Sequence, residues 1–422
     1  MTGIGKNTLL RNLASLGAVQ AASSLIQLLV IPHVVRKVGV DGFGIVVTAQ
    51  VIMLLITAIT DYGFNQTATR HIALKRDNPA LVSVIFYRVL FSKLLLLGAA
   101  FIFLVLLVLA VPFLRLHFMV YLLGFMFVIG QTCFINWFFQ GIERMQYLAV
   151  LTLVGRIIFA LLVFLFIRKQ GHESLFLFFL GVGNFIAATI GVILAHRVFK
   201  VSFKRPSVSE VASELKEGWS LMIANLSGFV CQYANLFLLR VFTNDLVVGY
   251  FGIAERIFLT VKQILVVFSQ AIYPQVCRAI GDGRNAVISY FRKIYAPFFA
   301  CFASLVLLLY FFAPQVLAYF IPLRFQPSVF YLRAFCLVLV IVCLNIPATV
   351  SLLGLDQRKK YLMIVSTALV LNLSCNLILA ALFGPRGTVS AILVTETFIT
   401  AALNLQFFRM MRSGVMVNSV SG

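Results

Sequence analysis

Apolar stretches recur from one end of this chain to the other, with only short polar segments between them. A helix of about 20 residues crosses the hydrocarbon core of a bilayer, which is roughly 30 Å thick. Of the 422 residues, 62% are hydrophobic and 11% are charged, a balance that the core of a water-soluble domain does not need. The solvent for most of the chain is therefore lipid, and no room is left for a soluble domain.

These stretches predict an all-α membrane protein with about twelve transmembrane helices in two six-helix bundles. We expect an N-terminal bundle at 1–196, a linker at 197–217 and a C-terminal bundle at 218–422. The predicted helices lie at 8–32, 42–62, 83–111, 118–140, 146–167, 173–195, 218–242, 246–272, 294–320, 328–352, 360–382 and 386–409.

The distribution of Lys and Arg predicts the orientation. With the N-terminus inside, about 20 of the 34 basic residues fall in ends and loops that would be cytoplasmic, and about 7 fall in the opposite loops. Both termini are therefore predicted to be cytoplasmic. The net charge of +21 is spread over short loops rather than over one folded basic face, so it does not indicate a nucleic-acid partner.

The cysteines and histidines do not form a metal-binding pattern. The seven cysteines lie in or beside apolar spans without a Cys-x-x-Cys pair, and the five histidines are scattered over span ends and loops. The sequence also lacks a Walker loop and a Gly-x-Ser-x-Gly elbow. We predict no metal, no cofactor and no catalytic residue.

The two halves of the chain resemble each other. Polar residues on the first predicted helix recur on the seventh at an offset of 212 or 213 residues, and the turn at 141–144 (GIER) resembles the turn at 354–358 (GLDQR). Because each half has an even number of helices, the repeats should have the same orientation and be related by an axis along the membrane normal. The recurring residues are Asn12, Gln20 and Gln27, matched by Asn225, Gln232 and Arg240.

Charged residues inside the spans are mostly basic, and a cavity lined by them would attract anions. For Arg88 and Lys93 the alternative is that they extend to the headgroups from near the end of a helix. For Lys262 and Arg256 the alternative is an ion pair with Glu255. Arg256 is the better phosphate ligand, because its planar guanidinium group can donate two parallel hydrogen bonds to phosphate oxygens. The candidate substrate-binding residues are Arg11, Asn12, Arg88, Asn225, Gln232, Arg240, Arg256 and Lys262.

Three carboxylates are candidates for ion coupling: Glu396, Glu255 and Asp61. Glu396 falls near the middle of the last span, where a carboxylate is protonated, paired or part of a cation pathway. Pairing with an arginine is the alternative for Glu396. Asp61 ends the second span, and a structural cap or loop contact is the alternative role there.

Three passages also resemble a known family. They are the first predicted outside loop at 39–44, the segment 61–70 (DYGFNQTATR) after the second span, and the turn 137–145 (WFFQGIERM) between the fourth and fifth spans. With the spacing of the spans over the full length, they resemble the Wzx-type O-antigen flippases of the polysaccharide transporter group. The superfamily of that group also contains MATE multidrug exporters and lipid II flippases.

The resemblance implies a MATE-like, V-shaped pair of bundles in the bacterial inner membrane. It implies alternating access, and transfer of an undecaprenyl-pyrophosphate-linked glycan from the cytoplasmic to the periplasmic leaflet; an O-unit polymerase and a chain-length regulator are candidate partners. A MATE-like exporter of small molecules is one alternative, but a cation exporter should favour acidic residues. An O-antigen polymerase or ligase is another, but such enzymes need a larger outside loop than this sequence has.

Overall fold

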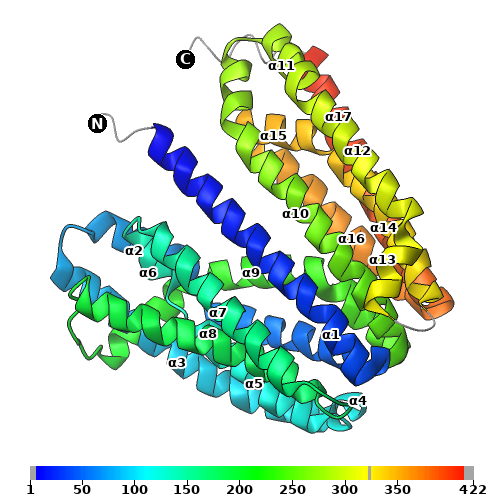
Figure 1. Ribbon diagram of the computed structural model, residues 1–422. Coiled ribbons are helices and arrows are strands. Elements are labelled where there is room, and N and C mark those ends of the chain that lie inside the picture. The colour runs from blue at the N-terminus through cyan, green and yellow to red at the C-terminus, as the bar shows by residue number, and fades with distance from the viewer. Residues whose placement is uncertain (1–5, 322–324, 413–422) are drawn as a thin grey trace. The chain divides into compact units, whose positions relative to one another are not determined.

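The computed structural model describes residues 6–321 and 325–412, and within these ranges the regular structure is helical (Figure 1). Side chains are not described for residues 6–21, 24, 220, 224, 227, 228, 231, 232 and 358. Nine helices of the described part are long and apolar enough to cross a membrane. The prediction of an all-α membrane protein is confirmed, whereas the count of twelve helices and the side of the termini stay predictions.

The chain forms two compact units, Met1–Ala234 and Asn235–Gly422. Their boundary lies within one helix, and the predicted assignment of 197–217 as a linker stays a prediction. The first unit contains α1 (Lys6–Asp61), α2 (Phe64–Lys75), α3 (Pro79–Ala110), α4 (Pro112–Arg115), α5 (Phe118–Cys133), α6 (Asn136–Gly141), α7 (Met145–Phe166), α8 (Glu173–Arg197) and most of α9 (Val208–Phe242).

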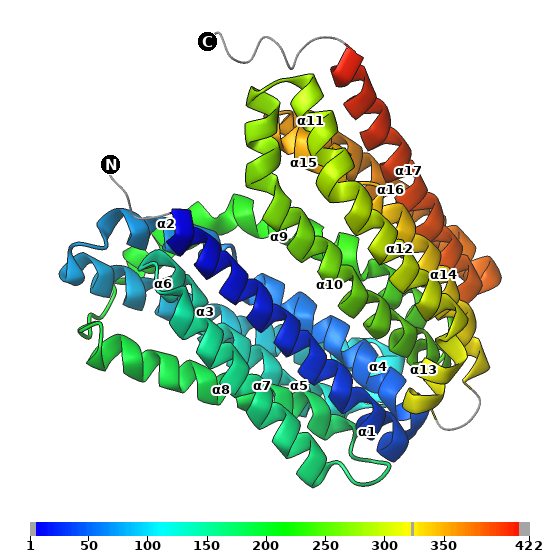
Figure 2. The ribbon, with the colours of Figure 1, turned by 45° about the horizontal axis from the view of Figure 1, so that its top comes forward.

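The second unit contains the end of α9 and the helices that follow it. These are α10 (Asp245–Gly281), α11 (Arg284–Tyr290), a π-helix (Phe291–Tyr295), α12 (Ala296–Phe311), α13 (Ala313–Phe320), α14 (Gln326–Cys343), α15 (Ile346–Gly354), α16 (Arg358–Phe383) and α17 (Pro385–Arg412). The helices α12, α14 and α17 lie side by side (Figures 1 and 2).

Several predicted spans are interrupted in the structure. The first two correspond to the arms of α1, which bends at Gly39, where φ is 84° and ψ is 168°. The predicted helix 328–352 breaks between α14 and α15, where Pro347 lies in the first turn of α15 and cannot continue the preceding helix. The predicted helix 294–320 ends early, with Pro314 at the start of α13. The predicted helix 118–140 breaks at Phe134 and Ile135, between α5 and α6.

The repeated turn noticed in the sequence has the same backbone in both units. Glu143 has φ of 57° and Asp356 has φ of 55°, a left-handed conformation that is uncommon for residues other than glycine. The N–H of Arg144 donates to the Phe139 carbonyl at 2.8 Å, and that of Gln357 donates to the Leu352 carbonyl at 2.9 Å. Each of these residues in the first turn lies 213 positions before its equivalent in the second turn, which supports an internal duplication.

Glycines allow α5, α7 and α8 of the first unit to approach one another closely, and these helices lie side by side (Figures 1 and 2). A Cβ atom added to Gly181 would lie 2.2 Å from the main-chain carbon of Met126 on α5. One added to Gly183 would lie 2.3 Å from the carbonyl oxygen of Gly155 on α7. Small residues of this kind let helix backbones pack without the hydrophobic drive that water would supply.

Aromatic side chains fill the core beside α2, α3 and α6. Trp137, Phe138 and Phe139 are at most 1% exposed, and Phe86 packs against both Trp137 and Phe138 with ring centroids 5.4 and 5.3 Å away. The aromatic residues of the 137–145 passage therefore build the core rather than line a cavity. Their burial fixes the position of α6, which begins at Asn136.

Candidate functional site

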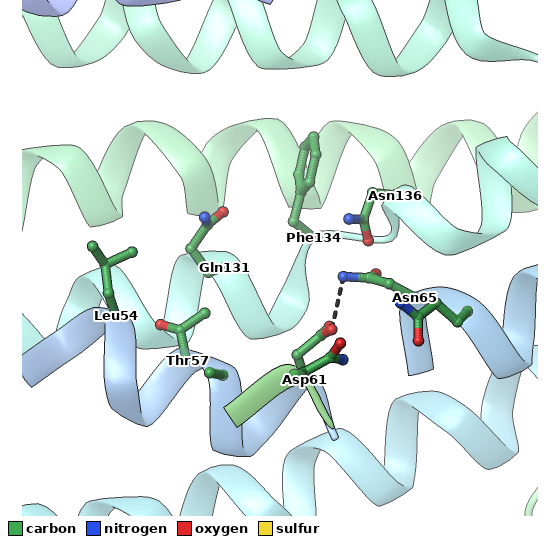
Figure 3. Close-up of a pocket in the computed structure, with 10 residues that line it drawn as sticks. Leu54, Thr57, Asp61, Asn65, Gln131, Phe134 and Asn136 are labelled. Carbon is green, nitrogen blue, oxygen red and sulfur yellow. Dashed lines mark hydrogen bonds between the residues drawn. The ribbon is translucent and has the colours of Figure 1, made fainter. Parts of the chain in front are cut away.

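A cavity of about 380 Å³ lies within the first unit. Its walls come from the last turns of the second arm of α1, the start of α2, the α5–α6 break and one turn of α9 (Figure 3). Three residues are apolar, and most of the others are uncharged and polar. The lining residues are Leu54, Thr57, Ala58, Asp61, Asn65, Gln66, Gln131, Phe134, Asn136 and Asn225.

Asp61 is the charged residue of this wall, and both of its carboxylate oxygens have partners. Oδ1 lies 3.1 Å from Nζ of Lys93 on α3, and Oδ2 accepts a hydrogen bond from Nδ2 of Asn65 at 2.8 Å (Figure 3). The Lys93 side chain is 2% exposed. The alternative that Lys93 extends to the headgroups is therefore wrong, because the Asp61 carboxylate holds the ammonium group inside the unit.

The turn between α1 and α2 brings Asp61 and Asn65 together. Tyr62 and Gly63 have φ of 49° and 84°, so the chain reverses and α2 begins at Phe64. A Cβ atom on Gly63 would lie only 2.6 Å from Cβ of Leu221, so α9 packs directly on this turn. The close approach places Asn225, one helical turn after Leu221, in the wall of the cavity.

The break between α5 and α6 supplies the opposite wall. Gln131 lies in the last turn of α5 and faces Thr57, while Asn136 begins α6 and faces Asn65 (Figure 3). The Oδ1 atom of Asn136 accepts a hydrogen bond from the N–H of Trp137 at 2.9 Å. The Oδ1 atom of Asn65 is buried and has no hydrogen-bond partner in the described structure.

The second unit holds a separate pair of opposite charges on two of its helices, α10 and α17. Nζ of Lys262 on α10 lies 3.8 Å from Oε1 of Glu396 on α17, and the side chains are 33% and 19% exposed. Lys262 also lies over the ring of Phe258, 5.5 Å from its centroid. The partner of Glu396 is therefore a lysine, where the sequence suggested an arginine. Glu255 and Arg256 lie on the same helix, α10.

Two other predicted substrate ligands have protein partners nearby. An Nη atom of Arg88 donates to Glu210 at 2.9 Å and another lies 3.8 Å from Glu214. Arg240 donates to both carboxylate oxygens of Asp245, at 2.6 and 3.0 Å, where α9 meets α10. Both arginines therefore have structural roles, and their predicted binding of substrate stays a prediction.

The sequence prediction and the cavity share Asp61 and Asn225. The side chains of Arg11, Asn12 and Gln232 lie outside the described residues. Sequence reasoning missed the polar residues that complete the cavity, although a signal existed: Gln131 and Asn136 are amides at the end of an apolar span. The missed polar residues are Thr57, Asn65, Gln66, Gln131 and Asn136.

Comparison with known proteins finds relatives along almost the whole chain. Residues 9–279 match the family described as "Polysaccharide biosynthesis protein". A protein of Escherichia coli (strain K12) named "Putative O-antigen transporter" is 27% identical over 408 residues, covering 96% of this chain and 97% of the relative. A protein of Shigella dysenteriae with the same name is 24% identical over 402 residues, covering 92% and 97%.

The fold is also similar to that of solved transporters. A multidrug resistance MATE family transporter of the MOP superfamily, solved in an inward-facing conformation, aligns with a TM-score of 0.69. The alignment covers 94% of this chain and 96% of that one at 15% sequence identity, so it supports the fold alone.

Proposed function

Because the chain belongs to the polysaccharide biosynthesis protein family, we propose that it is a flippase for undecaprenyl-pyrophosphate-linked oligosaccharide. It is a multi-pass transporter of the bacterial inner membrane, with relatives named as O-antigen transporters and a MATE-like fold. The proposed step moves the glycan headgroup from the cytoplasmic to the periplasmic leaflet by alternating access, while the lipid tail stays in the bilayer.

The Lys262–Glu396 contact is the observation that carries this proposal. A cation inside a span is costly unless it is paired or faces a polar interior, and an arriving pyrophosphate would compete with Glu396 for Lys262. Arg256, six residues earlier on α10, is proposed to add a guanidinium fork that matches phosphate oxygens.

The same contact suggests how transport is coupled to an ion gradient. When pyrophosphate takes Lys262, Glu396 loses its cationic partner and must bind a proton or another cation to avoid a bare charge within the span. When the substrate leaves, Lys262 re-forms the pair and Glu396 releases that ion. Because Glu396 binds the ion together with the substrate and releases it with the substrate, each transfer responds to a proton or sodium gradient.

A cell-surface glycan assay tests the binding role. In the bacterium that encodes this chain, with the chromosomal gene deleted, Arg256→Ala and Lys262→Met should abolish surface glycan at normal protein abundance. Arg256→Lys should restore part of it, because the charge remains but the fork is lost. Arg168→Met, which changes a residue in the segment between α7 and α8, is the control and should keep normal glycan. Normal glycan in both loss-of-charge variants would contradict the proposal.

A further inference from the structure

The cavity of the first unit is neutral as well as polar. The negative charge of Asp61 is balanced by Lys93 at 3.1 Å, and the remaining polar groups of the wall carry no charge. A pyrophosphate would meet a carboxylate in this wall instead of an available cation. A small cation would meet a carboxylate that an ammonium group already neutralises. Neither a pyrophosphate nor a small cation would recover from this wall the hydration free energy that it loses on leaving water.

The wall is instead rich in groups that donate and accept hydrogen bonds at once. Asn65, Gln66, Gln131, Asn136 and Asn225 each present a carbonyl oxygen and an NH₂ group, and Thr57 adds a hydroxyl. A ligand with a hydroxyl at every position, each both donor and acceptor, matches such a wall. An apolar ligand would leave these groups, including the partnerless Oδ1 of Asn65, without partners.

We propose that this cavity is a subsite for one or two uncharged sugar residues of the transported glycan, read by the Asn and Gln side chains. The inference rests on the proposed function. A volume of about 380 Å³ is near the lower end of the range for small-molecule pockets, so the cavity accommodates part of an oligosaccharide and not a long chain. The pyrophosphate is bound elsewhere, by the cationic residues of the second unit.

The subsite contributes to glycan recognition and not to the binding of the lipid pyrophosphate. Gln131 and Asn225 are the most direct test residues, because they come from different helices and neither bonds to Asp61. Removing one hydrogen-bonding side chain from the cavity should weaken glycan binding by about two- to tenfold.

Two probes separate the sugar from its carrier. The first is lipid-linked oligosaccharide extracted from the bacterium that encodes this chain, and the second is purified undecaprenyl pyrophosphate that carries no glycan. The affinity of the full chain in nanodiscs for each probe is measured by native mass spectrometry. The native protein should prefer the glycan-bearing probe. Gln131→Met and Asn225→Leu should reduce that preference while leaving the affinity for the second probe unchanged.

A fluorescence measurement places the sugar. The chain has two tryptophans, and in a Trp219→Phe background the remaining one is Trp137, which follows Asn136 of the cavity wall and whose main-chain N–H donates to the Oδ1 atom of Asn136. The glycan-bearing probe should shift the emission of Trp137, and undecaprenyl pyrophosphate without a glycan should not. Gln140→Met is the matched control for the cavity variants and should keep the emission shift, because Gln140 lies on α6 but is not among the cavity-lining residues.

The outcomes separate the two proposals. Equal affinity of the native protein for both probes, or an unchanged preference in both cavity variants, would overturn the sugar subsite and leave the flippase proposal standing. Absence of binding to either probe by the native protein would overturn the flippase proposal, and the subsite with it.

Discussion

Breaking the Asp61–Lys93 pair should destabilise the first unit far more than breaking a surface pair. The Nζ–Oδ1 distance is 3.1 Å, and the two side chains are 21% and 2% exposed for Asp61 and Lys93. Asp61→Asn leaves an ammonium group buried without its counter-charge, which costs about 3–5 kcal/mol. Lys93→Met costs less, about 3 kcal/mol at most, because Asp61 keeps its bond from Asn65 and faces the cavity.

The double variant Asp61→Asn with Lys93→Met should recover most of this loss, because no charge is left in the core. Thermal unfolding in detergent, followed by tryptophan fluorescence, reports on the unit, since Trp137 and Trp219 both belong to it. At about 2–4 °C per kcal/mol for a domain of this size, Asp61→Asn should melt about 10 °C below the native protein.

The pair formed by Arg76 and Glu143 is the control for this cycle. Its atoms are 2.8 Å apart, but the side chains are 45% and 70% exposed, so Arg76→Ala should cost at most about 1 kcal/mol. If Asp61→Asn melts with the native protein, or if the double variant is as unstable as the sum of the single variants, the two charges do not stabilise each other and the reasoning is refuted.

Three further perturbations test the packing, the turn and the ionisation of the protein. Gly181→Ala should lose about 1–3 kcal/mol of stability, because the added Cβ meets the main chain of α5. Gly98→Ala is the control and should be neutral or stabilising, because the space around Gly98 is open. Equal melting temperatures of the two variants would contradict the close helix contact. Asp356→Val should be less stable than Asp356→Gly by about 1 kcal/mol in the same assay, because Asp356 has a left-handed φ of 55° that glycine adopts more readily than valine. The reverse order would exclude a left-handed conformation at this position. Burial raises the pKa of Glu214 above its ordinary value, so ionising this carboxyl costs more free energy in the folded state than in the unfolded state. Glu214→Gln should therefore melt at a higher temperature than the native protein at about pH 7.5. This difference should vanish below about pH 4.5, where Glu214 is protonated in both the folded and the unfolded state. A variant that melts at a lower temperature at neutral pH would show that pairing of Glu214 with Arg88 outweighs burial.

The sequence was sufficient to predict the fold class, because the length of an apolar span is set by the bilayer and each span is a local feature. The repeated turns were visible for a similar reason, since Glu143 and Asp356 occupy equivalent places in short local motifs. Breaks within spans were harder to predict. Pro347 marks the start of α15, but the break at Phe134 depends on how α6 is packed and has no proline to announce it.

The candidate site could be predicted only in part, since pairing between distant helices decides it. Lys93 near the end of a span has the same sequence signature whether it reaches the headgroups or, as here, Asp61 on another helix. Glu396 was recognised from its depth in the last span, but its partner Lys262 is 134 residues away. Asn225 was predicted through the repeat, whereas Gln131 and Asn136 were missed because they lie beside the α5–α6 break, which no proline marks in the sequence.

Translocation by the purified protein is the most direct test of the flippase proposal. The full chain is reconstituted in liposomes with lipid-linked oligosaccharide from its own bacterium, and transfer is followed by loss of the glycan's accessibility to an added glycosidase. We expect transfer that depends on the protein, responds to an imposed proton or sodium gradient, and loses that response in Glu396→Gln. A full gradient response in Glu396→Gln would leave Glu396 a structural partner of Lys262 and shift the coupling role to Glu255 or Asp61. Transfer no faster than in protein-free liposomes, under either gradient, would contradict the flippase function itself.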